Sequence, residues 1–125
     1  MQNSTLTYDS RLDSTFLESI YENDKEDAAF GFEQFLNSYP AQLNELEQSF
    51  ETGDVNSFRQ KIHKLKPTFS FVGLTGVTAK AEIIEKNCQE TAEIQVLTDL
   101  YLDFKNTLSE LIPVVENQFS KLTTQ

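Results

Sequence analysis

The chain is poor in the side chains on which many protein sites depend: its 125 residues include one histidine, one cysteine and no tryptophan. Zinc sites need clusters of His and Cys, and di-iron helical bundles need two Glu-x-x-His pairs, so neither metal site is expected. The single cysteine, Cys88, cannot form an intramolecular disulfide, which fits a reducing compartment. We expect Cys88 to be a small buried side chain rather than a nucleophile.

Long apolar runs and glycine-rich loops are also missing. No segment approaches the roughly 18 consecutive apolar residues of a membrane span, and the first residues lack the basic region and apolar core of a signal peptide. We therefore expect a cytoplasmic protein without membrane contacts. The closest approach to a phosphate-binding loop, Gly73 to Gly76, fits a helix connector instead, so no ATP-dependent kinase activity is expected.

Acidic residues dominate the charge, and the net charge of −10 opposes binding to nucleic acid or anionic membranes. The stretch from Val55 to Ala81 is the exception, because it contains no Asp or Glu. We call it the basic segment. It holds five cationic side chains, namely Arg59, Lys61, Lys64, Lys66 and Lys80.

Apolar residues recur at spacings of three and four along most of the chain, and no alternating pattern of strands is present. Five such stripes predict an all-α protein, an antiparallel four-helix bundle with a short additional N-terminal helix. We assign residues 11–122 to this bundle and residues 1–10 to a flexible N-terminal segment, and we expect a monomer. The stripes begin at Leu12, Phe32, Val55, Val77 and Leu97.

Capping residues and prolines mark where these helices begin, end and bend. Asp13 or Ser14 is expected to cap the first helix, and Gly53 followed by Asp54 predicts the end of one helix and the start of the next. Prolines inside two stripes predict a kink near Tyr39 and a kink or interruption in the last helix. These prolines are Pro40 and Pro113.

The only histidine, His63, lies in the middle of the basic segment. The apolar positions around it are spaced 3, 4, 3, 4 and 3, from Val55 to Val72, which is the stripe of a core-facing helix. At about 100° per residue, His63 points about 140° away from the centre of that stripe, so it faces water. An exposed imidazole among cations is a plausible carrier of an anion. Its neighbours on that face are Arg59, Lys66, Pro67, Ser70 and Phe71.

The sequence His63-Lys64-Leu65-Lys66, with Gly73 ten residues after the histidine and Glu85 twenty-two after it, resembles the signature of histidine-containing phosphotransfer (HPt) domains. The order of predicted helices is similar over residues 12–120. The resemblance implies that His63 accepts a phosphoryl group from an aspartyl phosphate on a receiver domain and passes it to another receiver. Such receivers belong to response regulators or hybrid histidine kinases, and no nucleic acid is expected as a partner.

The resemblance also suggests roles for the neighbours of His63. Lys66 and Lys64 are expected to stabilise the charge of the phosphoryl group, and Glu85 either orients the imidazole or is an ordinary surface residue. We expect the partner to contact four residues of the histidine helix, with Phe71 either exposed for docking or buried by rotation of the helix end. No cofactor is expected on this chain, and Mg²⁺ would come with the receiver. The four expected contact residues are Arg59, Pro67, Ser70 and Phe71.

Pro67 is a departure from the family, which usually has glycine at this position. A proline there removes the partner of the His63 carbonyl and predicts a kink, convex to solvent, at the active residue. Two other functions are compatible with the sequence. One is a noncatalytic acidic helical adaptor in which His63 is not phosphorylated, and the other is a general acid/base enzyme using His63 and Glu85.

Overall fold

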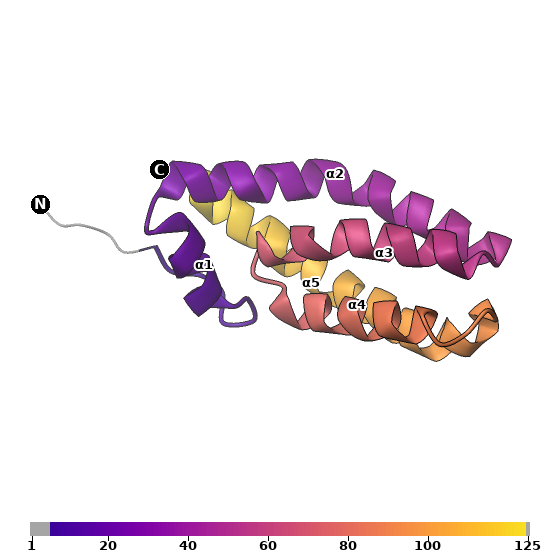
Figure 1. Ribbon diagram of the computed structural model, residues 1–125. Helices are drawn as coiled ribbons and strands as arrows, with labels where there is room; N and C mark the ends of the chain where they lie inside the picture. Colours follow the sequence, from indigo (N-terminus) through magenta and orange to yellow (C-terminus); the bar gives the residue numbers. More distant parts are fainter. Residues whose placement is uncertain (1–5, 125) are drawn as a thin grey trace, which may run out of the picture.

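The computed structural model describes residues 6–124, and within them the secondary structure is entirely helical. Consecutive long helices run in opposite directions and lie side by side, while the short first helix sits at one end of the bundle (Figure 1). The predicted antiparallel bundle with a short additional helix is therefore confirmed. The elements are α1 (Ser14–Tyr21), α2 (Lys25–Thr52), α3 (Val55–Ser70), α4 (Thr75–Cys88), the short 3₁₀ helix η1 (Ile94–Leu97) and α5 (Thr98–Thr123).

The helix boundaries follow the local chemistry of the chain. Asp13 and Asp54 each cap a helix by accepting the backbone N–H three residues on, at 3.0 and 3.1 Å. Gly53 ends α2 with a φ of 78°, a conformation that glycine adopts without steric cost. The first helix is thus capped by Asp13, and both caps at the turn between α2 and α3 are confirmed.

Three expected boundaries differ slightly. The histidine helix ends at Ser70 rather than near Val72, and Gly76 lies inside α4 rather than in the preceding turn. The last apolar stripe begins in η1, so Leu97 belongs to a short 3₁₀ helix ahead of α5. All three differences lie at helix ends, where backbone groups lack intrahelical partners and boundaries shift by a few residues. The bodies of the helices are as expected, so the apolar stripes still face the core.

Proline interrupts none of the long helices. Pro40 lies inside α2, Pro67 inside α3 and Pro113 inside α5, and each helix continues through its proline. All three proline side chains are exposed, so each ring faces water and each lost hydrogen bond is on the solvent side. The direction of α2 changes along its length, as Figure 1 shows. Helix α5 continues through Pro113 and is not interrupted.

Aromatic side chains link α2, α3 and α5 in the centre of the bundle. Phe69 of α3 packs edge-on against Phe35 of α2 and Phe104 of α5, with ring centres 6.0 and 5.7 Å apart. Phe58 makes a similar contact with Tyr101 at 5.1 Å. Burial of each such ring contributes about 1.5–3 kcal/mol, so the apolar face of α3 is held firmly and its opposite face is fixed toward solvent.

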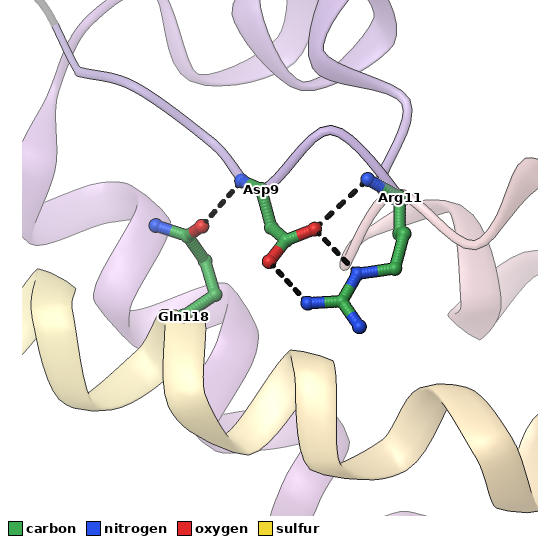
Figure 2. A network of polar contacts seen from close by, with 3 residues as sticks. All are labelled: Asp9, Arg11 and Gln118. Carbon is green, nitrogen blue, oxygen red and sulfur yellow. Dashed lines mark hydrogen bonds and ion pairs between the residues drawn. The ribbon is translucent and has the colours of Figure 1, made fainter.

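The described part of the N-terminal segment lies against the bundle. The backbone N–H of Asp9 donates to Gln118 of α5 at 2.7 Å, and Asp9 also pairs with Arg11, as Figure 2 shows. The hydrogen bonds from Arg11 lower the pKa of Asp9 to about 2. Leu6 and Tyr8 pack against the core. The expectation of a flexible segment over residues 1–10 falls partly on residues 1–5, which lie outside the described residues.

Helix α1 is tied to the loop between α3 and α4. Tyr21 donates its hydroxyl hydrogen to the carbonyl of Phe71 at 2.7 Å, and Thr75 donates to the carboxylate of Asp13 at 2.9 Å. The backbone N–H of Asp13 donates to the carbonyl of Gly73 at 2.8 Å. These contacts fix the path of the chain directly after the histidine helix.

Candidate functional site

The site is built on the solvent face of α3. The helix buries Val55, Phe58, Ile62, Leu65 and Phe69, and this leaves the side chain of His63 67% exposed. The predicted orientation of the histidine is therefore confirmed. An imidazole so exposed is open to a second protein, while the buried face of the same helix keeps its backbone in place.

Glu85 on α4 contacts the histidine directly. Its Oε2 lies 2.6 Å from Nδ1 of His63, and its Oε1 accepts a hydrogen bond from Nζ of Lys66 at 2.9 Å. Burial of Glu85 on its own raises the pKa of the carboxyl. The hydrogen bonds from Lys66 and His63 outweigh that effect, so the pKa lies below its ordinary value and the group is a carboxylate at neutral pH.

This contact defines the state of the imidazole ring. A carboxylate only accepts hydrogen bonds, so Nδ1 of His63 must carry the hydrogen and donate it to Glu85. In the neutral ring the other nitrogen, Nε2, then holds a lone pair. Nε2 has no hydrogen-bond partner within residues 6–124. The arrangement presents a nucleophilic nitrogen on an exposed side chain and holds the ring by its opposite edge.

The two lysines of the signature have different surroundings. Lys66 is about a quarter exposed and paired with Glu85, so its ammonium offsets the carboxylate beside the imidazole. Lys64 is exposed, and within residues 6–124 its ammonium has no carboxylate partner. Only Lys66 is therefore joined to His63 through a shared acceptor. The expected stabilisation of a phosphoryl group by either lysine stays a prediction.

The structure separates the four residues expected to contact a partner. Pro67 is exposed on α3, and Phe71, the residue directly after α3, is 50% exposed. Of the two positions expected for Phe71, exposed or buried by rotation of the helix end, the structure has the exposed one. Ser70 lies at hydrogen-bond distance from Thr78 of α4, with 3.3 Å between their hydroxyl oxygens. Arg59 donates to Asn56 and lines a hollow beside Cys88, at the opposite end of α3. The partner contacts themselves stay predictions.

Two features of a hollow between α2 and α3 were not predicted from the sequence. Lys61 lines the same groove between α2 and α3 as Lys64, and the buried Oε1 of Gln42 in that groove has no hydrogen-bond partner in the described chain. Lys61 belongs to the basic segment, and this was the one signal that pointed to it. Cys88 is buried as expected, and burial raises the pKa of its thiol to about 11.

Two features are absent from residues 6–124. These residues contain no group of three or more His, Cys, Asp or Glu side chains arranged to hold a metal ion. None of their helices has both the length and the apolar character needed to traverse a bilayer. The candidate site consists of His63, Glu85 and Lys66, which are joined by the hydrogen bonds described above.

Comparison with protein-family models gives a match over most of the chain. The family model of the Hpt domain matches residues 32–118, which include the whole of α3 and α4 and most of α2 and α5. No curated protein and no solved structure matches the chain. The match covers well over half of the sequence, and it spans both His63 and Glu85. The chain belongs to the Hpt domain family.

Proposed function

We propose that this protein is a phosphorelay intermediate: His63 accepts a phosphoryl group from an aspartyl phosphate on one receiver domain and passes it to another. The observation that carries the proposal is the exposed imidazole whose Nδ1 lies 2.6 Å from the carboxylate of Glu85. That contact leaves Nε2 as the attacking nitrogen. Membership of the Hpt domain family supports the same chemistry.

The transfer forms one bond and breaks one. The lone pair of Nε2 attacks phosphorus, the bond between phosphorus and the aspartyl oxygen breaks, and the electron pair leaves with the receiver's carboxylate. The ring gains positive charge as the N–P bond forms, and the hydrogen on Nδ1 stays in its bond to Glu85. Since the carboxylate is already in place, its negative charge stabilises the ring without reorganisation. Transfer to a second receiver is the reverse of these steps.

Cations near His63 limit repulsion of the incoming group. Lys66 neutralises much of the charge on Glu85, so the carboxylate repels the phosphoryl oxygens less. Lys64 follows His63 in the chain and supplies a mobile ammonium for those oxygens. We further propose that the Mg²⁺ needed for transfer is held by the receiver, and that the protein acts in the cytoplasm.

Labelled phosphoryl transfer tests the proposal. The wild-type chain and His63→Gln are incubated with Mg²⁺ and a set of receiver domains from the source organism, each labelled on its aspartate. We expect acid-labile, base-stable label on the wild type alone, because phosphohistidine hydrolyses in acid. Circular dichroism of both proteins shows that the variant is folded.

Two results would contradict the proposal. Label on His63→Gln would place the phosphoryl group elsewhere, and no label from any receiver would favour a noncatalytic acidic helical adaptor. Chemical phosphorylation with phosphoramidate controls for the reactivity of the imidazole. A wild type that is labelled by phosphoramidate and by no receiver has a reactive imidazole that receivers do not use, which contradicts the proposal.

A further inference from the structure

A hollow of about 380 Å³ lies between α2 and α5, and we call it the α2–α5 hollow. Helix α2 packs against α3 and α5, and α4 packs against the same two helices. The seam between α2 and α5 is therefore on the opposite side of the bundle from the seam between α3 and α4, where His63 meets Glu85. The hollow is a surface separate from the candidate site.

The α2–α5 hollow has apolar walls and a polar group at one end. At that end the carboxylate of Glu47 accepts hydrogen bonds from the hydroxyl of Tyr101 at 2.7 Å and from the ammonium of Lys105 at 3.1 Å. Lys105, the cation that lines the hollow, is thus already paired within the protein. Three aliphatic side chains form the apolar walls, namely Leu43, Leu108 and Ile112.

Unpaired carboxylates lie beyond both ends of the hollow. Glu51 is one turn of α2 beyond Glu47, and burial, the hydrogen bond to Glu47 and these two negative charges raise the pKa of Tyr101. At the other end, burial and the charge of Glu116 raise the pKa of Tyr39, which lines the hollow. Glu51 and Glu116 are exposed, and neither has a cationic partner within residues 6–124.

A proline adds a backbone acceptor beside the hollow. Ser109 and Pro113 of α5 both line it, and both are exposed. Because Pro113 has no N–H, the carbonyl of Ser109 lacks its usual helical donor. An ammonium or guanidinium group on a partner can supply that donor.

The charges of the whole bundle favour a cationic partner at this seam. Helices α2 and α5 carry ten Asp and Glu residues and three lysines, whereas α3 carries four cations and no Asp or Glu. The two lysines of α2 and α5 other than Lys105 act elsewhere: Lys25 donates to the carbonyl of Thr124 at 2.8 Å, and Lys121 is close enough to Asp9 to lower its pKa. A positively charged segment is therefore attracted to the side of α2 and α5 and repelled from the side of α3.

We propose that the α2–α5 hollow docks a basic amphipathic helix of a partner protein. Apolar side chains of that helix enter the hollow against Leu43 and Ile112, and a lysine or arginine near each of its ends pairs with Glu51 or Glu116. The inference does not rest on the proposed function, because the hollow lies on the opposite side of the bundle from His63.

The length of the seam is the argument for a helix over a small ligand. From Tyr39, near Glu116, to Glu51, α2 extends about 18 Å at a rise of 1.5 Å per residue, which is about three turns of a partner helix. A small cation cannot reach both carboxylates at once. A helix can do so while its apolar face covers the space between them.

A synthetic peptide tests the hollow. The probe is a fluorescein-labelled helical peptide of about four turns, with arginines near both ends and leucines along one face between them. The control peptide has the same composition in scrambled order and no apolar face. We expect saturable binding of the probe alone, measured by fluorescence anisotropy. Amide shifts in NMR spectra of the protein should change along residues 39–51 and 101–116.

Charge reversal and filling of the hollow identify the surface. Glu51→Lys and Glu116→Lys should each weaken binding of the probe about fivefold at low salt, and the difference should shrink as salt is added. Glu82→Lys makes the same change of charge at an exposed position of α4 and should have little effect. Ser109→Trp fills the hollow from an exposed position, and we expect it to weaken binding about tenfold at every salt concentration.

Four results would overturn the docking proposal. They are absence of binding by the probe, equal binding of the probe and the scrambled peptide, equal binding of the probe by Ser109→Trp and the wild type, and loss of binding in His63→Gln, which would place the probe at the opposite seam. Self-association of the wild type that Ser109→Trp abolishes would make a second copy of this chain the occupant, and it also contradicts the proposal. Circular dichroism and thermal unfolding show that each variant is folded.

Discussion

His63 and Glu85 face each other across two helices, with Nδ1 of the imidazole 2.6 Å from the carboxylate oxygen Oε2. They are 22 residues apart in the chain, and the loop from Phe71 to Leu74 reverses its direction between them. The second oxygen of Glu85 holds Lys66, one turn of α3 beyond His63. A single carboxylate thus fixes both the imidazole and the nearest ammonium.

Removing this carboxylate should slow phosphoryl transfer. A hydrogen bond to a charged group contributes about 1.5–3 kcal/mol, so we expect Glu85→Ala to lower the rate at saturation by about 10- to 100-fold. Glu85→Gln keeps an acceptor for Nδ1 and should lose less. Rapid-quench transfer from a labelled receiver measures both. Equal rates for Glu85→Ala and the wild type would mean that the contact does not position the ring.

Pro67 can be replaced without disturbing the buried face of α3. Its side chain is exposed and its missing N–H leaves the carbonyl of His63 without the usual helical donor. Pro67→Ala restores that donor, but it also removes the restriction that proline places on the unfolded chain. The net effect should be a rise in the free energy of unfolding of about 1–2 kcal/mol. Urea unfolding provides the measurement. Pro113→Ala is the matched control in α5, and a fall in stability for Pro67→Ala alone would contradict the expectation.

Gly73 and Gly76 should respond in opposite directions to alanine. Gly73 has a φ of 77°, and a Cβ there would lie 2.7 Å from a methyl carbon of Leu17 and 3.0 Å from the backbone nitrogen of Asp13. We expect Gly73→Ala to destabilise the fold by about 2–3 kcal/mol.

A Cβ on Gly76 would meet nothing within 4 Å, and the residue lies in α4. Gly76→Ala should therefore stabilise the protein by about 0.5–1 kcal/mol. Thermal unfolding of the two variants gives both values. If both substitutions cost the same stability, the close contact between Gly73 and the start of α1 does not hold in solution.

Cys88 should react slowly with thiol reagents at neutral pH. Burial raises the pKa of its thiol to about 11, and the thiolate is the reactive form. Alkylation by iodoacetamide should therefore quicken about tenfold per pH unit between pH 8 and 10, where a free thiol of ordinary pKa levels off. Mass spectrometry follows the reaction at the single cysteine. Fast alkylation of the folded protein at pH 7 would contradict the burial of this thiol.

Much of the fold is determined by local patterns in the sequence. The stripe from Val55 to Val72 is enough to show which side of the helix His63 occupies, because helical periodicity depends only on spacing. Gly53 and Asp54 mark a helix end and a helix start through the conformations that these residues favour. The Hpt signature around His63 points to the family without any knowledge of the tertiary structure.

The tertiary structure decides which side chains meet. Whether Glu85 reaches His63 depends on how α3 and α4 are rotated and offset against each other, and no spacing within either helix encodes that. The same packing binds Lys66 to Glu85 and leaves Lys61 and Lys64 along a hollow between α2 and α3. It also keeps Phe71 exposed. The sequence by itself determined the place of the single histidine and its orientation to solvent, and only helix packing determined the groups that hold its ring.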